Sequence, residues 1–551
     1  MPPLSANVIQ DLSWLETQCS IRRLTDAAKW ASEMLYYLPG EVEGAQIEQP
    51  TKLSKAVRMA RNCMDCQEFD RAAFFLARDP EQNNLTVFLR FYARYLAGEK
   101  KRLDSMADVT DKRQTFENGA VHELHRDLEA LEERRGMDGF LYYLYGLVLL
   151  SQNLRAEAKA AFENSVNAHP AFWPAWLEIA KLVETRYELR ELRLPDHWLR
   201  PFFTADVHQR LQMLTTAIEQ YQSLIDAGFG DIPYIIGQMA AARHGLQDLD
   251  LALDGFNKVH EMDPYRIEQM DVYSNALYVQ NMRVELAALA HYFYDVNKFC
   301  PETCCIVGNY YSLRGEHERA ALYFQRALKL DPKCAGAWTL VGHEFMELKN
   351  TSAACLAYHH ALEIDKKDFR GWYGLGQMYD ILRMPAYALY YYQQAHKCRP
   401  DDSRMIVALG DMYSKQGRYA EAQKCFWKAH TVGDIERTAL VRLGKLFEKE
   451  QDNDQAASCY MKYLKQIEKQ GQGMEDVNNQ YNCYRFLAKY CLDKDKYDEA
   501  HHFAQLCLDY DSTKEDGKTF LKKVTLARNK PPSSTNAADG DQMQVDGGVP
   551  L

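Results

Sequence analysis

The sequence predicts an all-α fold in which helix-turn-helix units stack into a superhelical solenoid. Three observations support this prediction. Glycines recur every 34 residues, at Gly308, Gly342, Gly376, Gly410 and Gly444. Small and aromatic residues recur at fixed distances from these glycines. The units carry apolar residues at helical spacing and lack the alternating apolar pattern of a strand.

The unit at residues 369–402 matches the tetratricopeptide (TPR) repeat most fully. That repeat has bulky, small or aromatic residues at positions 4, 7, 8, 11, 20, 24 and 27 and proline at position 32. The matching residues are Trp372, Leu375, Gly376, Tyr379, Ala388, Tyr392, Ala395 and Pro400. Units 301–334 and 335–368 match almost as well in the same register, so the sequence predicts a TPR superhelix.

From this centre, the register predicts seven contiguous TPR units over 233–470 and one further unit at 481–514. The residues before position 233 match less closely. We expect TPR-like units within 1–170, of which 139–172 fits best, and a divergent repeat with a charged loop over 171–232.

Irregular segments are expected between and after these units. Two charged stretches, 99–120 and 184–200, are interpreted as loops between repeats. A helix is expected at about 206–227. Residues 529–551 are rich in Pro, Ser, Gly and Asp and have few apolar side chains, which is typical of a disordered tail.

Candidate binding residues follow from the geometry of the repeat. Positions 2, 5, 9 and 12 lie opposite the packed stripe of each first helix, so they face the concave groove. Position 9 carries Asn275, Asn309, His343, Gln377, Asp411 and Lys445. Nearby candidates are Asp271, Tyr278, Tyr373, Asp380 and Arg404. This ladder of amides and carboxylates favours a ligand rich in arginine, although a solvated polar face remains the alternative.

Composition and motifs argue against several other functions. The formal net charge is −11 with no concentrated basic stripe, so no nucleic acid partner is expected. No segment is apolar and long enough to span a membrane. Cys63 and Cys66 form a lone C-x-x-C pair without a second pair or nearby histidines, so no metal is expected. No catalytic or cofactor-binding motif occurs, and we expect neither an active site nor a cofactor.

One class of TPR adaptor can be tested directly. Cochaperones that bind acidic C-terminal tails carry a basic residue at position 5. Here position 5 holds Gly237, Asp271, Cys305, Thr339, Tyr373, Val407 and Val441. The carboxylate clamp is missing, which disfavours a cochaperone or trafficking adaptor without excluding it.

Several stretches resemble the anaphase-promoting complex subunit 8 (cell division cycle protein 23) family. They include EMDPYRIEQMDVYSNALYV (261–279), ETCCIVGNYYSLRGEHERAALYFQRALKLDP (302–332) and WYGLGQMYDILRMPAYALYYY (372–392). The resemblance extends to residues that the generic repeat does not require, such as Asp263-Pro264-Tyr265-Arg266. It is specific over 233–470, and another TPR subunit of the same complex remains an alternative.

The resemblance implies a non-catalytic scaffold subunit of a ubiquitin ligase of the nucleus and cytoplasm. Its implied partners are a second copy, bound through the N-terminal repeats, other subunits of the complex, and a WD40 coactivator. The coactivator would place an arginine of its N-terminal box against Asn309 and Glu344. Groove geometry independently selects Asn309, whereas Glu344 comes from the resemblance alone.

Overall fold

The computed structural model contains only helices as regular structure within the residues that it describes, which confirms the expected all-α fold. The described residues are 6–38, 53–108, 118–434, 437–470, 476–509 and 513–528. The expected disordered tail, 529–551, lies outside them. The chain divides into two compact units, residues 1–332 and 333–551, called here the N-terminal and C-terminal units.

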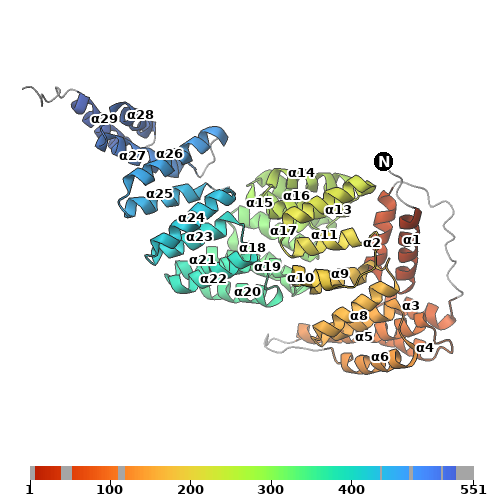
Figure 1. The fold of residues 1–551 in the computed structure, drawn as a ribbon. Helices are drawn as coiled ribbons and strands as arrows, with labels where there is room; N and C mark the ends of the chain where they lie inside the picture. The colour runs from red at the N-terminus through yellow and green to blue at the C-terminus, as the bar shows by residue number, and fades with distance from the viewer. Residues whose placement is uncertain are drawn as a thin grey trace, which may run out of the picture. The chain divides into compact units, whose positions relative to one another are not determined.

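The N-terminal unit consists of consecutive helical hairpins (Figure 1). Its helices are α1 (Ala6–Ile21), α2 (Thr25–Tyr37), α3 (Lys55–Asp65), α4 (Phe69–Ala77), α5 (Asn84–Asp108), α6 (Val121–Arg135), α7 (Gly139–Ser151), α8 (Arg155–Ala168), α9 (Trp173–Leu182), α10 (Arg186–Glu191), α11 (Arg200–Arg210), α12 (Leu214–Leu224), α13 (Pro233–Gly245), α14 (Leu249–Met262), α15 (Met270–Val279), α16 (Arg283–Asn297), α17 (Pro301–Leu313) and α18 (His317–Leu330). A π-helical turn, η1 (Ile225–Phe229), follows α12.

The C-terminal unit continues the same alternation of first and second helices. Its helices are α19 (Ala335–Glu347), α20 (Thr351–Ile364), α21 (Phe369–Ile381), α22 (Pro385–Cys398), α23 (Ser403–Lys415), α24 (Tyr419–Gly433), α25 (Thr438–Lys449), α26 (Asn453–Gln470), α27 (Asp476–Asp493), α28 (Tyr497–Leu506) and α29 (Lys514–Arg528), with a 3-10 turn, η2 (Cys507–Asp509), after α28.

A single left-handed residue closes the turn between the two helices of most hairpins. These residues include Gln212, Gln247, Asn281, Gly315, Lys349, Arg383, Gly417 and Gln451. In the turn at Gly315, the next amide, that of Glu316, donates to the Tyr311 carbonyl at 3.0 Å and so caps the end of α17. This bond is typical of a helix that ends on a left-handed residue. The recurrence of the turn shows that one local structure is repeated along the chain.

The 34-residue glycines lie where the two helices of a hairpin come closest. A Cβ atom at any of them would lie 2.4–2.6 Å from an aromatic ring of the second helix, closer than carbon atoms can approach. The pairs are Gly308 with Phe324, Gly342 with Tyr358, Gly376 with Tyr392, Gly410 with Phe426, and Gly444 with Tyr460. Positions 8 and 24 therefore pack as the TPR framework predicts.

Two segments expected to be loops are helical in part, whereas residues 192–199 are irregular as expected. Residues 99–108 are instead the last turns of α5, whose last buried apolar residue among the described side chains, Ala97, lies before the charged stretch. Residues 186–191 form the short helix α10, whose N-cap is Thr185: its hydroxyl accepts a hydrogen bond from the Glu188 amide. Charge alone was a poor indicator of a loop because both helices expose most of their charged residues.

The single helix expected at 206–227 is instead a hairpin of α11 and α12. It turns at Gln212, which has a φ of 61°. Ala205, Ala217 and Tyr221 are buried and occupy TPR positions 8, 20 and 24 of a unit that begins at residue 198. The wider turn η1 adds one residue before α13. That insertion shifts the unit that begins at residue 198 out of the 34-residue register. The fixed spacing therefore did not reveal this unit in the sequence.

The first hairpin also contacts residues far along the N-terminal unit. The Trp198 indole donates a hydrogen bond to Asp11 on α1 at 2.9 Å. The Lys29 ammonium lies 2.6 Å from Glu268, and Arg266 forms an ion pair with Glu33. These contacts place α2 against the segment between α14 and α15.

Candidate peptide-binding groove

In the N-terminal unit, the expected groove residues lie on the neighbouring first helices α15 and α17. Asp271, Asn275 and Tyr278 share one face of α15, being four and three residues apart. Asn309 lies on α17 and is 2% exposed. Its side-chain amide nitrogen donates to Ser274 Oγ at 2.8 Å and to Asn275 Oδ1 at 2.7 Å. The amide ladder expected from position 9 is therefore formed between these two repeats.

This network fixes which way the Asn309 amide points. The Ser274 hydroxyl donates its hydrogen to the Asp271 carbonyl at 2.6 Å, so it can only accept from Asn309. The Asn309 nitrogen must face Ser274, and its oxygen Oδ1 faces the other way. Within the described residues, Oδ1 makes no hydrogen bond. Asn309 therefore presents an acceptor to an incoming donor such as a guanidinium group.

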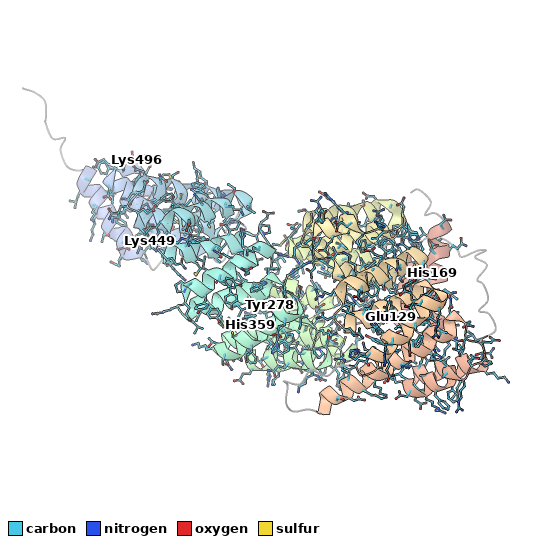
Figure 2. The ribbon with its side chains drawn as sticks, turned by 60° about the horizontal axis from the view of Figure 1, so that its bottom comes forward. Glu129, His169, Tyr278, His359, Lys449 and Lys496 are labelled. Carbon is cyan, nitrogen blue, oxygen red and sulfur yellow. The ribbon has the colours of Figure 1, made fainter. Side chains whose placement is uncertain are left out.

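Tyr278 stands at the edge of this polar stripe. Its ring is 39% exposed, and it is labelled in Figure 2. Its hydroxyl oxygen accepts a hydrogen bond from Ser312 Oγ at 3.3 Å. The ring thus offers an exposed aromatic face within reach of a cation or an apolar side chain.

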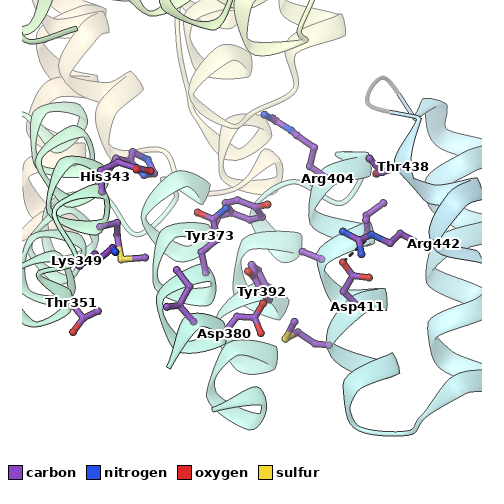
Figure 3. Close-up of a pocket in the computed structure, with 17 residues that line it drawn as sticks. His343, Lys349, Thr351, Tyr373, Asp380, Tyr392, Arg404, Asp411, Thr438 and Arg442 are labelled. Atoms are coloured by element: carbon purple, nitrogen blue, oxygen red, sulfur yellow. Dashed lines mark ion pairs between the residues drawn. The ribbon is translucent and has the colours of Figure 1, made fainter. Parts of the chain in front are cut away.

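In the C-terminal unit, the first helices α19, α21, α23 and α25 line a groove of about 810 Å³ (Figure 3). Six of the residues expected from the sequence line it: His343, Tyr373, Gln377, Asp380, Arg404 and Asp411. Met346, Val407 and Thr438 also line it, and they occupy the same repeat positions, 12, 5 and 2. The rule based on positions 2, 5, 9 and 12 thus describes the surface of this groove.

The floor of the groove is aromatic. The Tyr373 and Tyr392 rings pack in a tilted arrangement with centroids 5.3 Å apart. Burial, followed by the nearby Tyr373 and the carboxylates of Asp380 and Asp411, raises the pKa of Tyr392 well above its usual value. Its hydroxyl therefore stays protonated and can donate. Tyr392 was expected only as a packing residue at position 24, yet it serves both roles.

Two carboxylates stand over this floor, each paired with a cation from the next repeat. Asp380 lies 2.5 Å from Lys415, and Asp411 lies 3.6 Å from Arg442, the ion pair drawn in Figure 3. The carboxylates are 28% and 27% exposed, whereas the two cations are about half exposed. Pairs of this kind contribute about 0–1 kcal/mol, so a ligand cation could displace Lys415 or Arg442 from its carboxylate.

His343 is held as a neutral acceptor at one end of the groove. The Tyr358 hydroxyl lies 2.9 Å from its Nδ1. Burial, followed by the charge of Arg370, lowers the pKa of His343 to about 4. Because Tyr358 keeps its proton, the hydroxyl donates and the imidazole accepts. His343 therefore contributes no charge to the groove near neutral pH.

Arg404 is fixed at the groove wall by an aspartate at the start of its own helix. Its Nε and Nη2 donate to Asp402 at 3.2 and 2.9 Å, and Asp402 also caps the Arg404 amide. Asp368 and Arg370 form the same arrangement one repeat earlier. The recurring Asp-x-Arg spacing was visible in the sequence but was not recognised as a positioning device.

Glu344 lies on α19 of the C-terminal unit and is 5% exposed. Its carboxylate contributes, after burial, to the raised pKa of Tyr358. Asn309 lies in the N-terminal unit, whereas Glu344 lies in the C-terminal unit. Among the described residues, no group of three or more His, Cys, Asp or Glu side chains could hold a metal ion. No helix in those ranges is long and apolar enough to cross a membrane.

Comparison with known proteins identifies the family. The model of anaphase-promoting complex subunit 8 / Cdc23 matches residues 52–240, and a tetratricopeptide model matches 301–334 and 403–429. Subunit 8 of Dictyostelium discoideum is 34% identical over 396 residues, which cover 60% of this chain and 67% of that protein. The chain belongs to the anaphase-promoting complex subunit 8 / Cdc23 family.

Other members of the subunit 8 / Cdc23 family are similar over shorter regions. Subunit 8 of Arabidopsis thaliana is 41% identical over 297 residues, 54% of this chain and 51% of that protein. The Mus musculus cell division cycle protein 23 homolog is 44% identical over 49% of this chain and 46% of that protein. The chain therefore spans only about half the length of these two relatives.

A solved structure supports the fold of the subunit 8 / Cdc23 family member described here. A chain of the APC/C hetero-tetramer Cut9-Hcn1 superposes with a TM-score of 0.55 at 17% identity. The match covers 86% of this chain and 96% of that one. At this identity the likeness supports the TPR superhelix and says nothing further about binding.

Proposed function

We propose that this chain is a non-catalytic scaffold subunit of the anaphase-promoting complex, a ubiquitin ligase of the nucleus and cytoplasm. Membership of the subunit 8 / Cdc23 family supports the assignment. A stack of helical hairpins also suits the role, because it offers long concave surfaces to partners. Ubiquitin transfer would then be carried out by other subunits and the enzymes that they recruit.

The groove residues are proposed to bind the arginine-containing N-terminal box of a WD40 coactivator. The observation that carries this proposal is the orientation of the Asn309 amide, whose Oδ1 is left as an acceptor for a guanidinium donor. Glu344 would supply the carboxylate. Tyr373, Asp380 and Asp411 of the C-terminal groove are further candidates for contacts with this peptide.

Homodimerisation through residues 1–170 and contacts with other subunits complete the proposal. Family membership supports both. A sister TPR subunit of the same complex, or a TPR adaptor, would share the architecture but bind a different peptide. Purifying the chain with its partners and identifying the co-purifying proteins distinguishes these functions.

The coactivator proposal is tested by fluorescence anisotropy with a labelled peptide of the arginine box. A carboxylate bonded to a charged donor contributes about 1.5–3 kcal/mol, so Glu344→Ala should weaken binding roughly tenfold or more. Asn309→Ala should reduce the binding free energy of the peptide by less, about 0.5–1.5 kcal/mol. Glu363→Ala is the matched control, because it removes a carboxylate that is 72% exposed on the second helix α20.

A second peptide makes the outcome specific to the arginine. Citrulline has the shape of arginine but no charge, so replacing arginine with citrulline should weaken binding to the unaltered chain. The same replacement should have little further effect in the Glu344→Ala variant. Equal losses in both proteins would place the arginine elsewhere in the groove, with Asp271, Asp380 and Asp411 as the next carboxylates to test.

A further inference from the structure

A second cavity lies inside the N-terminal unit, between α2, α5, α7, α9 and α13. Its volume is about 380 Å³. Five aromatic side chains line it: Trp30, Tyr92, Tyr143, Trp173 and Tyr234. Trp30 stacks on Trp173 with centroids 5.2 Å apart and meets Tyr234 edge-on at 6.1 Å. Aromatic faces gathered in this way are suited to a cation with an apolar stem.

The cavity is also rich in carboxylates. Asp26, Glu33, Glu178 and Glu268 line it, whereas Lys29 is the one cation in its wall. Arg266 forms ion pairs with Glu33 and Glu268, and Lys181 forms one with Glu178, so these four carboxylates are accompanied by three cations.

Two of these carboxylates, Asp26 and Glu178, are placed to meet a ligand cation. Glu178 is 16% exposed, and its paired cation, Lys181, is 53% exposed and does not line the cavity. Asp26 makes no ion pair with any described residue. Its charge contributes, after burial, to raising the pKa of Tyr92 to about 12. Lys181 therefore partly neutralises Glu178, whereas Asp26 has no cationic partner among the described residues.

Two buried hydrogen-bond donors belong to the same wall. Neither the Trp30 nor the Trp173 indole N–H meets an acceptor among the described residues, and Trp173 is 1% exposed. Indole nitrogen can only donate, and a buried donor without a partner is costly. Both nitrogens are themselves shielded from solvent, so the two indoles offer a ligand their aromatic faces and not a hydrogen bond.

We propose that this cavity binds a lysine or arginine side chain of an extended peptide from a partner protein. The cationic group would meet Asp26 and Glu178, and its aliphatic stem would pack on the indoles. A bare metal ion would gain little from the aromatic wall, and the negative charge would repel a nucleic acid backbone. This site is separate from the proposed coactivator groove on α15 and α17.

The test uses the full chain and an eight-residue, end-blocked peptide with one arginine among glycine and alanine. A matched peptide carries citrulline instead. Isothermal titration should show binding of the arginine peptide roughly tenfold tighter than that of the citrulline peptide. Asp26→Asn should remove most of that difference, and Trp30→Phe should weaken both peptides by a similar factor. Glu129→Gln, which removes an exposed carboxylate from α6, should change nothing.

Two outcomes would overturn the proposal. One is equal affinity for the two peptides. The other is arginine binding that Asp26→Asn leaves unchanged, which would place the arginine elsewhere. Asp26 is exposed, so its replacement should leave the fold intact, and circular dichroism checks this. If the arginine peptide fails to bind while Asp26→Asn alters self-association in sedimentation, the cavity receives a second copy of the chain instead of a partner peptide.

Discussion

Replacing one framework glycine with alanine should destabilise the C-terminal unit, although alanine is the better helix former. At Gly342, a new Cβ would lie 2.5 Å from Cε1 of Tyr358 and 2.8 Å from two further ring atoms. The ring cannot move away easily. A Cβ at Gly374, on the neighbouring helix α21, would lie 2.5 Å from the same Tyr358 ring. The Tyr358 hydroxyl is also hydrogen-bonded to His343.

Two opposing effects determine the magnitude. Alanine in place of glycine inside a helix gains about 1 kcal/mol. Overpacking a well-filled core costs about 1–3 kcal/mol, and a ring held from two sides lies at the upper end of this range. We therefore expect Gly342→Ala to lose about 2 kcal/mol. In the same helix, a Cβ at Gly336 would meet only the end of Arg370, at 3.9 Å, so Gly336→Ala should be neutral or slightly stabilising.

Urea unfolding followed by circular dichroism measures both variants. The two substitutions are chemically identical and lie six residues apart, so propensity and purification effects cancel in their difference. Gly374→Ala should lose a similar amount, and the double variant should lose less than the sum because both clash with one ring. If Gly342→Ala were as stable as Gly336→Ala, the close approach of the helices would not be what requires glycine.

Three further predictions concern single side chains. Arg266→Ala should destabilise the N-terminal unit in thermal unfolding by about 3 kcal/mol, the lower end of the cost of breaking a buried pair, since it leaves Glu33, 15% exposed, without its paired cation. Lys29→Ala should cost below about 1 kcal/mol because its ion pair is exposed. Ser274→Ala should lower the affinity for the arginine-box peptide several-fold in anisotropy, roughly as the loss of a neutral hydrogen bond does. Ser274 is not proposed to contact the peptide itself, and the effect arises because the Asn309 amide loses the hydroxyl that orients it. The folded-state pKa of His343 lies below that of an unfolded histidine, so the unit should lose stability as pH falls from about 6.5 to about 4. His343→Gln should flatten this slope in urea titrations at several pH values.

Much of the fold could be predicted because each repeat specifies its own structure locally. The glycine at position 8 and the ring at position 24 are in the sequence, and so is the turn that brings them together. The unit beginning at residue 198 was not predicted, because η1 inserts one residue between it and the next unit. A pattern with a fixed 34-residue spacing no longer matches the repeat beyond such an insertion. Ala205, Ala217 and Tyr221 nevertheless pack as the TPR framework requires.

The groove residues could be predicted for the same reason. Their positions follow from helix geometry within one repeat, so nine of the lining residues obey the rule of positions 2, 5, 9 and 12. Their ion pairs could not be predicted. Lys415 and Arg442 reach back from the following repeat, and which carboxylate each one meets depends on how far neighbouring hairpins rotate against each other.

The cavity of the N-terminal unit was invisible to sequence analysis because its walls come from residues 24–268, which no local rule relates. In an ideal solenoid, each repeat contacts only its neighbours. Here α2 instead meets α9, α13 and the segment before α15 through Trp30, Lys29 and Glu33. These contacts close the first hairpin onto the later repeats of its own unit. Closure both creates the cavity and brings carboxylates from three separate segments into one wall, so a candidate binding site arises that no single repeat encodes.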